Sequence, residues 1–348
     1  MTIEKTIAEA FTLPGHIRHI EPLGKGLIND SYLVTTPTAK GVLQRINADV
    51  FPSPGKIMAN LRQITDYLAR HRDPGIRLPG IIPARDGKDW VMDEAGGYWR
   101  MLEYIEDSEN KARIENLAEA EILGESLGRL HCLLAGLAVD KFHVTLPGFH
   151  VTPNYLARLD RVLATTKSLP VDVQPIVDFI QQRREQAPIL EDDKSTGELP
   201  LRIIHGDPKL DNVLFSKTTG EPMAWVDLDT IQPDLVLYDI GDCIRSACRG
   251  KNGQFDLDTA SAVLKGWFRE AKFFLTPAER HHVPDAIGLL PYELGIRFLT
   301  DYLEGNRYFK VSYREENLHK AQKQFELLAD IEKKSASLQE RWENIQAE

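Results

Sequence analysis

The segment from Leu201 to Asp242 constrains the fold of this chain more than any other. Three short apolar runs within it have the composition of β-strands, and each is followed or preceded by polar residues of the kind that strands place in loops. The runs are Arg202–Ile204, Val213–Phe215 and Ala224–Val226. A small sheet with polar loop edges is a common support for catalytic side chains.

Three side chains at these loop edges have the chemistry that phosphoryl transfer needs. The reaction uses a carboxylate to orient the attacking hydroxyl and accept its proton, and oxygen ligands to hold Mg²⁺ on the nucleotide phosphates. Asp207 and Asn212 supply a base and an oxygen ligand from one loop. Asp227, after the next strand, supplies an anionic metal ligand. We expect His205, at the start of the loop, to hold the loop backbone by hydrogen bonds.

Composition and charge exclude several other classes of protein. The 348 residues are 42% hydrophobic and 27% charged, with a formal net charge of −10. Because binding to a phosphate backbone needs clustered Lys and Arg, we expect no nucleic-acid partner. No apolar run approaches the ~18 residues of a membrane helix, and the N-terminal segment lacks the apolar core of a signal peptide. We expect a cytoplasmic protein without a membrane partner, most simply a monomer.

The first hundred residues have the pattern of a small mixed lobe. A glycine-rich turn, Gly24-Lys25-Gly26, separates two runs of β-type residues, and a helical pattern follows the third run. The predicted strands are Arg18–Pro22, Ser31–Thr35, Val42–Ile46, Trp90–Met92 and Trp99–Tyr104, and the predicted helix is Ile57–Leu68.

The rest of the chain is expected to be mainly helical. Apolar residues at helical spacing predict helices at Leu117–Val139, Asn154–Thr165 and Val171–Arg184. Pro188–Pro200 is polar and charged and is predicted to be a connection without regular structure. Lys320–Glu348 is predicted to be one solvent-facing terminal helix.

The loop pattern H-x-D-x-x-x-x-N resembles the catalytic loop of protein kinases and, more closely, that of the aminoglycoside phosphotransferase and choline kinase superfamily. Asp227 resembles the metal-binding Asp of that superfamily, and Asp239 resembles a brace for the catalytic loop. The resemblance implies an α+β, two-lobed protein-kinase-like fold with a small mixed β lobe and a larger, mainly helical lobe. We assign a nucleotide-binding lobe to residues 1–104 and a catalytic and substrate-binding lobe to residues 105–348.

The same resemblance implies an ATP site in the first lobe. Glycines in a turn between strands let backbone N–H groups approach phosphates closely, and this role falls to Gly24 and Gly26, with Asn29 beside them. Glu103 and Ile105 match the hinge whose backbone groups would bind adenine.

The third strand departs from the usual pattern, in which a Lys contacts the phosphates. Gln44 stands at the matching position, and we expect it to belong to the nucleotide site. Either Gln44 acts as a neutral donor to the phosphates, or Arg45 or Lys25 supplies the charge.

Within the superfamily, the whole chain is most similar to the N-acetylhexosamine 1-kinases. In that subgroup Gln also replaces the third-strand Lys, and the catalytic loop can read His-Asn-Asp where this chain has His-Gly-Asp. The resembling segments are Gly26–Thr35, Leu43–Pro52, Trp99–Glu106, Phe149–Pro153, Val226–Pro233 and Gly295–Phe309.

The subgroup resemblance implies ATP- and Mg²⁺-dependent phosphorylation of the anomeric hydroxyl of an N-acetylhexosamine, with Asp229, Arg297 and Tyr308 holding the sugar. A neutral amido sugar needs mixed donors and acceptors, whereas cationic acceptors need acidic or aromatic walls. The alternative for Arg297 and Tyr308 is a helix end with a surface ion pair. Alternative functions are a kinase of aminoglycosides, choline or another small alcohol, and a nucleotide-binding pseudokinase scaffold.

Overall fold

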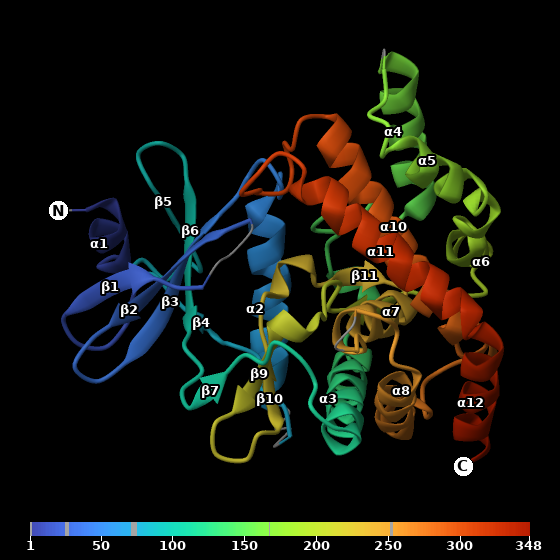
Figure 1. Ribbon diagram of the computed structural model, residues 1–348. Coiled ribbons are helices and arrows are strands. Elements are labelled where there is room, and N and C mark those ends of the chain that lie inside the picture. The colour runs from blue at the N-terminus through green and yellow to red at the C-terminus, as the bar shows by residue number, and fades with distance from the viewer. Residues whose placement is uncertain (1, 25–27, 71–74, 167, 251–252) are drawn as a thin grey trace. The chain divides into compact units, whose positions relative to one another are not determined.

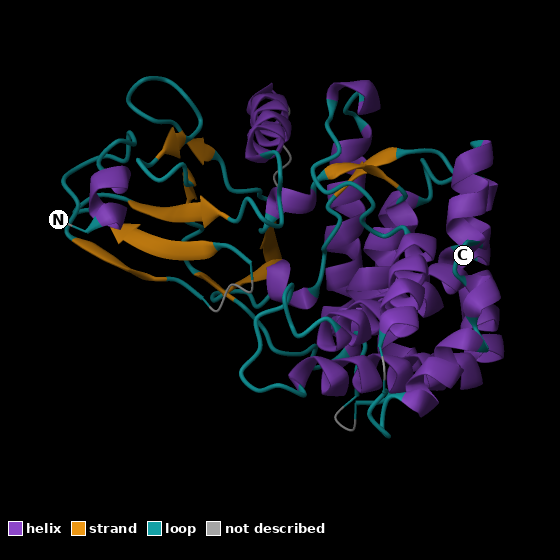
Figure 2. Cartoon of the chain, turned by 90° about the horizontal axis from the view of Figure 1, so that it is seen from above, coloured by secondary structure: helices purple, strands orange, loops and turns teal. Residues whose placement is uncertain are grey.

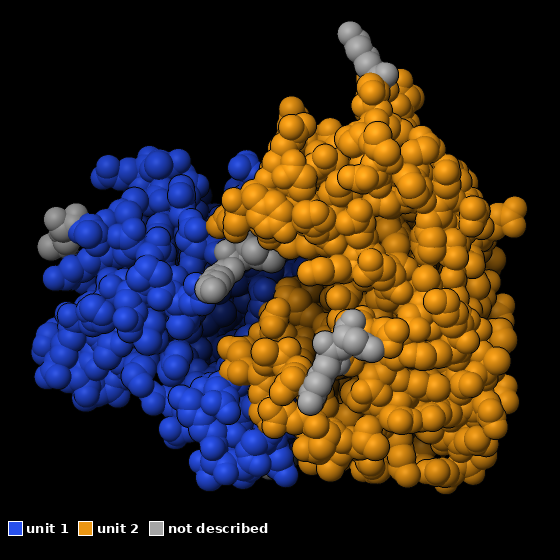
Figure 3. Space-filling model, viewed as in Figure 1, with its two compact units in different colours: residues 1–109, 140–147, 214–232 blue, residues 110–139, 148–213, 233–348 orange. Residues whose placement is uncertain are grey.

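The computed structural model describes residues 2–24, 28–70, 75–166, 168–250 and 253–348. The chain divides into two compact units, which Figure 3 shows in different colours. Unit 1 comprises Met1–Glu109, Asp140–Pro147 and Leu214–Gln232, and unit 2 comprises Asn110–Val139, Gly148–Val213 and Pro233–Glu348. No helix among the described residues is long and apolar enough to cross a membrane. The assignment of nucleotide binding to residues 1–104 and of catalysis to residues 105–348 stays a prediction.

Unit 1 is built on an antiparallel sheet with the order β1-β2-β3-β6-β4, and β5 also pairs with β6 (Figures 1 and 2). A second sheet has the order β10-β9-β7. The strands are β1 (His19–Pro22), β2 (Asp30–Thr35), β3 (Lys40–Ile46), β4 (Ile81–Ile82), β5 (Val91–Met92), β6 (Tyr98–Glu103), β7 (Ser108–Glu109), β9 (Val213–Ser216, all but its first residue) and β10 (Pro222–Trp225), and the helices are α1 (Ile3–Ala8) and α2 (Pro54–Arg70).

One hydrophobic cluster of unit 1 joins the main sheet to α1. Phe11, Val34, Leu43, Trp99 and Met101 are buried in one cluster, together with two residues of α1. Leu43 lies opposite Met101 in the register of β3 and β6, so the large side chains meet across the strands. Full burial stabilises each such side chain by about 1.5–3 kcal/mol relative to exposure.

Unit 2 is mainly helical. The largest helix–helix interface joins α3 and α8, and α10 packs against α4, α7 and α11. The helices are α3 (Leu117–Ala135), α4 (Thr152–Thr165), α5 (Gln174–Gln181), α6 (Ile189–Thr196), α7 (Val236–Ala247), α8 (Leu257–Ala271), α9 (Pro277–His281), α10 (Val283–Leu303), α11 (Glu316–Lys333) and α12 (Ser335–Ala347). The unit also holds β8 (Arg202–Ile204) and the last two residues of β11 (Gln232–Asp234).

The fold confirms the expected α+β class with a small antiparallel lobe and a larger helical portion, and corrects two local predictions. The segment 188–200 was predicted to lack regular structure, but it contains α6, which buries Leu190 and ends at the left-handed Gly197. The segment 320–348, predicted to be one solvent-facing helix, forms two helices that are separated at Lys334, and α11 buries Phe325, Leu328 and Ile331. Lys334 is fixed there by hydrogen bonds to the Phe255 carbonyl and Asp330.

Candidate active site

The loop between β8 and β9 holds the predicted base, Asp207. Its carboxylate accepts a hydrogen bond from Asn212 Nδ2 at 3.1 Å, and the same nitrogen donates to the Asp207 backbone oxygen at 2.8 Å. Lys209 forms an ion pair with the carboxylate. Because the amide nitrogen of Asn212 faces Asp207, its amide oxygen is the atom that could ligate a cation. The structure thus brings together the two site residues predicted on this loop.

Asp239, in the first turn of α7, holds the backbone of this catalytic loop. Its carboxylate accepts hydrogen bonds from the N–H groups of His205 and Gly206, both at 2.8 Å, and lies 3.0 Å from His131 Nε2. Trp267 Nε1 donates to His131 Nδ1 at 2.9 Å, so the imidazole carries its proton on Nε2 and donates it to Asp239. The predicted brace is therefore present, and it is extended by two further side chains.

His205 has the structural role that the sequence predicted. Its ring is fully buried, and Nδ1 accepts a hydrogen bond from the Asp207 N–H at 3.3 Å. The residue between them, Gly206, has a φ of +84°, which residues other than Gly and Asn adopt only under strain. That preference accounts for the Gly here.

Asp227, the second predicted metal ligand, follows β10 in unit 1. Its backbone is left-handed, with φ of +63° and ψ of +57°. Such a conformation is uncommon for a residue other than glycine, and residues held in it cluster at active sites and ligand clamps. The metal-binding role of Asp227, like that of Asn212, stays a prediction.

The donor types fit Mg²⁺. Among the described residues, no group of three or more His, Cys, Asp or Glu side chains could hold a metal ion by itself. Mg²⁺ is commonly bound by one or two protein carboxylates, with phosphate oxygens and water as its other ligands. A single carboxylate such as Asp227 and an amide oxygen such as that of Asn212 are donors of the kind that this cation accepts.

A buried polar network in unit 1 contains three predicted site residues. Arg100, fully buried on β6, forms an ion pair with Asp229 and donates from Nε to Gln44 Oε1 at 3.0 Å. Asn29 donates to Asp229 Oδ2 at 2.6 Å, and Gln44 donates to Ser31 Oγ at 2.9 Å. These side chains therefore hold one another in place. Contact of Asn29 or Gln44 with a nucleotide, and of Asp229 with a sugar, stays a prediction.

This network adds a candidate for the cation that could replace the missing Lys of the third strand. Lys25 lies outside the described residues, and Arg45 is a half-exposed side chain 3.9 Å from Asp93. Arg100 lies directly opposite Gln44 in the register of β3 and β6. It is a buried cation that the sequence reasoning did not consider.

The other predicted nucleotide-binding residues lie near the ends of two strands of the main sheet: Gly24 follows β1, and Glu103 and Ile105 lie at and after the end of β6. Gly24 has a φ of +72°, and a Cβ there would meet nothing within 4 Å, so the backbone conformation itself requires glycine. Gly26 lies outside the described residues. At the last residue of β6, the Glu103 N–H donates to the Gly80 carbonyl at 2.9 Å, and after β6 the Ile105 carbonyl accepts a hydrogen bond from the Ser108 hydroxyl at 2.7 Å. Adenine binding by Glu103 and Ile105 stays a prediction.

Arg297 and Tyr308 lie together in unit 2. The Arg297 guanidinium carbon is 5.9 Å from the Tyr308 ring centre and 5.1 Å from the ring centres of Phe149 and Tyr155. Its Nη1 lies 3.4 Å from Glu293, and the two side chains are only 14% and 1% exposed. The alternative of a surface ion pair is therefore wrong for Arg297, because the pair is buried among aromatic rings.

The electrostatic surroundings of Arg297 include the predicted base. Burial works against the charge of the guanidinium, but nearby groups outweigh it and raise the pKa of Arg297 above its usual value. These groups are Tyr155, Tyr308, Glu293 and Asp207. Within unit 2, Asp207 thus lies in electrostatic range of a residue that was matched to sugar recognition.

Asp301, at the end of α10, fixes the segment that carries Tyr308. Its carboxylate accepts hydrogen bonds from the N–H groups of Arg307, Tyr308 and Phe309 at 2.8–3.0 Å. Asn317 Nδ2 adds a fourth at 2.9 Å, and the Asp301 side chain is buried. Asp301 and Tyr308 are only seven residues apart, so a turn between them can bring the backbone of residues 307–309 to the Asp301 carboxylate. The spacing alone did not predict these hydrogen bonds.

Sequence reasoning assigned no role to several of these residues. Lys209 had a local signal, because a cation lies two residues after the predicted base. Arg100 had a weaker signal, because it is a charge within an otherwise apolar strand. Glu293 lies far along the chain from the catalytic loop and gave no signal.

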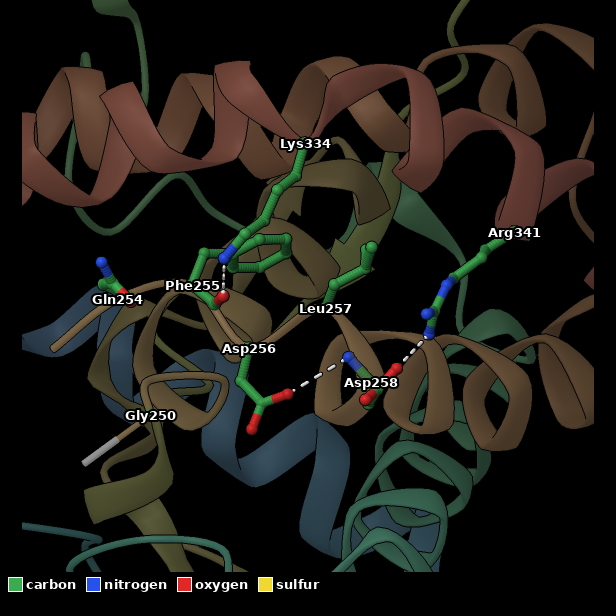
Figure 4. A pocket seen from close by; sticks show the side chains of 8 residues that line it. All are labelled: Gly250, Gln254, Phe255, Asp256, Leu257, Asp258, Lys334 and Arg341. Atoms are coloured by element: carbon green, nitrogen blue, oxygen red, sulfur yellow. Dashed lines mark hydrogen bonds and ion pairs between the residues drawn. The ribbon is translucent and has the colours of Figure 1, made fainter. Parts of the chain in front are cut away.

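A separate hollow of about 390 Å³ lies on unit 2, where Lys334 and Arg341 line it with residues around Phe255 (Figure 4). Lys334 donates to the Phe255 carbonyl, and Arg341 pairs with Asp258. None of the predicted site residues lines this hollow.

Comparison with known proteins identifies the family of this chain. The phosphotransferase enzyme family model matches residues 19–273. The homoserine kinase of Agrobacterium fabrum strain C58 is 25% identical over 264 residues, covering 73% of this chain and 71% of that protein. The homoserine kinase of Sinorhizobium medicae strain WSM419 is 24% identical over 308 residues, covering 83% of this chain and 80% of that protein.

Solved structures share the fold over nearly the whole chain. An aminoglycoside phosphotransferase from Alicyclobacillus acidocaldarius has a TM-score of 0.68 at 13% identity, covering 99% of this chain and 97% of that chain. A microcompartment-associated aminopropanol kinase has a TM-score of 0.61 at 18% identity, covering 97% and 98%. At these identities the likeness concerns the fold. With the family match over most of its length, the chain belongs to the phosphotransferase enzyme family and is a small-molecule kinase.

Proposed function

We propose that this kinase transfers the γ-phosphate of ATP to the anomeric hydroxyl of an N-acetylhexosamine and releases the sugar 1-phosphate. The observation that carries the proposal is the arrangement in unit 2. Arg297 and Tyr308, which were matched to sugar recognition, lie together among aromatic rings, with Asp207 in electrostatic range. The six segments that resemble N-acetylhexosamine 1-kinases support the same acceptor.

In this proposal Asp207 orients the acceptor hydroxyl and accepts its proton. Asn212 and Lys209 contact the carboxylate, while Asp239 and His205 bind the loop backbone, so the base is positioned before the acceptor arrives. The anomeric hydroxyl is more acidic than the other sugar hydroxyls. A carboxylate is therefore a suitable base for the proton transfer.

ATP and Mg²⁺ complete the proposal. Asn212 and Asp227 would hold the cation, and bound Mg²⁺ would neutralise the charge that develops on the phosphates. Gly24 would let backbone N–H groups approach these phosphates. Because the Glu103 N–H is bound to Gly80, the Glu103 carbonyl and the Ile105 N–H are the groups that we propose pair with adenine.

Arg297 and Tyr308 would recognise the sugar. The planar guanidinium offers several donors for hydroxyl and acetamido oxygens, and the surrounding aromatic rings offer faces for the apolar side of a sugar ring. Asp229 is the third residue matched to the sugar. Any contact that it makes has to coexist with its ion pair to Arg100.

A second acceptor, homoserine, is favoured by the names of the curated relatives. Homoserine carries a carboxylate, and Arg is the side chain best suited to bind a carboxylate through two parallel hydrogen bonds. Glu293, beside Arg297, is an anion that could face the ammonium group. Arg297 and Glu293 would then bind the carboxylate and the ammonium group of homoserine instead of a sugar.

Measuring ADP release separates these acceptors. The panel contains N-acetylglucosamine, N-acetylgalactosamine, the plain hexoses, homoserine, choline and an aminoglycoside, each with Mg·ATP. We expect kcat/KM to be highest for an N-acetylhexosamine. A kcat/KM for homoserine that exceeds every sugar by tenfold or more would establish the second acceptor and refute the first.

Substitution of Arg297 tests the recognition step. If Arg297 only holds the acceptor, Arg297→Ala should raise the acceptor KM strongly and leave the KM for ATP nearly unchanged. Unaltered acceptor kinetics in this variant would remove Arg297 from the proposed site.

A further inference from the structure

His150 lies between the catalytic loop and α10 and is almost fully buried. Its Nε2 lies 2.8 Å from the Gly206 carbonyl oxygen, and its Nδ1 lies 3.2 Å from Glu293 Oε1. Its own backbone has a φ of +58°, a conformation that is uncommon outside glycine. A buried imidazole, carried by an uncommon left-handed backbone, thus contacts the residue that directly precedes the predicted base.

The partners of His150 fix its protonation. A carbonyl oxygen only accepts, so Nε2 must carry a proton, and Nδ1 faces a carboxylate and carries one as well. Burial lowers the pKa of the ring, but Glu293 and other acceptors outweigh burial and raise the pKa to about 9. His150 is therefore an imidazolium that donates two hydrogen bonds. Glu293, the Gly206 carbonyl and the stacked ring of Tyr238 contact it, and Asp242 and Asp234 lie within electrostatic range.

The hydrogen bond from His150 acts on the peptide plane that leads into Asp207. The Gly206 carbonyl and the Asp207 N–H belong to one planar peptide group. His150 binds the oxygen end of this plane, and His205 Nδ1 accepts from the nitrogen end at 3.3 Å. Because glycine leaves the backbone at Gly206 unusually free to rotate, these two histidines are what holds the plane in one orientation.

Glu293 extends the contact to the predicted acceptor residues. It is 1% exposed and accepts from His150, from Thr152 Oγ1 at 3.3 Å and from Arg297 Nη1 at 3.4 Å. Glu293 and Arg297 are one turn apart on α10. The Glu293 carboxylate thus links two groups: through His150 it is connected to the Gly206 carbonyl, and directly it contacts the guanidinium of Arg297.

We propose that His150 and Glu293 form a positioning pair, in which His150 orients the Asp207 carboxylate through the Gly206–Asp207 peptide and Glu293 couples that orientation to Arg297. The proposal rests on Asp207 acting as the base, and it holds for either acceptor. Neither residue of the pair has to touch the substrate for it to act.

His150→Phe keeps a flat ring for stacking on Tyr238 and removes both N–H groups. A misplacement of about 1 Å at a reacting group can cost on the order of a hundredfold in rate. We therefore expect kcat to fall tenfold to a hundredfold with little change in the KM for ATP. His150→Gln keeps one donor for the Gly206 carbonyl and should recover part of kcat.

His282→Gln is the matched control. His282 is also a buried imidazole held by two acceptors, Asp193 and Asp285, each at 2.8 Å, but these partners lie on helices outside the catalytic loop. We expect His282→Gln to lower Tm and to leave kcat unchanged. Wild-type kcat in His150→Phe, or an equal loss of kcat in both variants, would overturn the proposal.

Glu293→Gln keeps the proposal testable if His150→Phe does not fold. Ring nitrogen NMR should show His150 with both nitrogens protonated in the wild type at pH 7.5, and with one protonated in Glu293→Gln, whose kcat should also fall at least tenfold. A singly protonated His150 in the wild type would overturn the proposal. So would losses of kcat/KM for the acceptor that simply multiply when His150→Phe is combined with Arg297→Ala, because coupled residues do not act independently.

If Asp207 is not the base, Asp207→Asn retains activity and the proposed function fails first. If Asp207→Asn is inactive while His150→Phe is not impaired, only the positioning pair fails. The two outcomes are therefore distinguishable in one set of variants.

Discussion

Substitution of Gly124 tests how the packing of unit 2 supports the catalytic loop. Gly124 lies on α3 where α3 crosses α8, and a Cβ there would lie 1.9 Å from the Val263 carbonyl oxygen and 2.9 Å from the Trp267 nitrogen. Both are backbone atoms, so they cannot rotate away. Non-bonded heavy atoms pack at about 3.5–4.0 Å, so Gly124→Ala has to push the two helices apart by roughly 1.5 Å.

The expected cost follows from two opposing effects. Overpacking typically costs about 1–3 kcal/mol, and a clash with backbone belongs at the upper end. Replacing a helical Gly by Ala returns about 1 kcal/mol through helix propensity. We expect a net loss of about 2 kcal/mol, which for a domain of this size corresponds to a decrease in Tm of roughly 4–8 °C.

Moving α3 and α8 apart should also disturb the catalytic loop. α3 carries His131 and α8 carries Trp267, and the 2.9 Å hydrogen bond between them holds the imidazole that binds Asp239. We therefore expect Gly124→Ala to lower kcat at temperatures well below its Tm.

Gly288→Ala, on α10, is the matched control for scanning fluorimetry. A Cβ at Gly288 would meet its nearest atom, in Leu328, at 3.8 Å, which is ordinary contact. Only the helix propensity changes there, so Tm should rise by a few degrees or stay the same. A Gly124→Ala protein as stable as the wild type would refute the reasoning about this helix crossing.

Three further predictions concern buried charges. Asp229→Ala leaves the cation of Arg100 without its partner, so stability should fall by about 3–5 kcal/mol, and a double variant with Arg100→Met should recover most of the loss in Tm. Asp301→Asn weakens charge-assisted bonds worth about 1.5–3 kcal/mol and loosens Tyr308, so the acceptor KM should rise while the KM for ATP does not; equal changes in both would contradict this role. Because the pKa of His150 is raised in the folded state, its contribution to stability is complete below the unfolded pKa of ~6.5 and is lost as the pH rises through about 9. The Tm difference between wild type and His150→Gln should shrink over that range, and a difference that grows would contradict it.

The catalytic loop could be predicted from sequence because its parts are local. Only four residues separate Asp207 from Asn212, and strand-like runs flank the segment, so their contact follows from the spacing. The brace at Asp239 was anticipated from a resemblance, and the structure confirms it. His131 was not anticipated, since it reaches Asp239 from a distant helix.

Apart from Lys209, which pairs locally with Asp207, the residues that sequence reasoning missed act through long-range contacts between side chains. Arg100 meets Asp229 across more than a hundred residues of chain, and His150 meets Glu293 across a similar span. Such pairs leave no periodic pattern in the sequence. A buried charge is tolerated only when the fold also places its partner beside it, and the sequence alone does not show that partner. α6 was missed for a different reason, since only Leu190 among its residues is buried and its composition resembles that of a loop.

Identifying the phosphorylated product tests the central claim most directly. The purified enzyme is incubated with Mg·ATP and an N-acetylhexosamine, and phosphorus–proton coupling in the NMR spectrum of the product locates the new phosphate, with Asp207→Asn as the control. We expect phosphate on the anomeric oxygen, in a product that is stable to alkali and labile to acid, and a loss of turnover of at least ~10² in the control. Phosphate on the 6-hydroxyl, no turnover of any N-acetylhexosamine, or near wild-type turnover by Asp207→Asn would contradict the account.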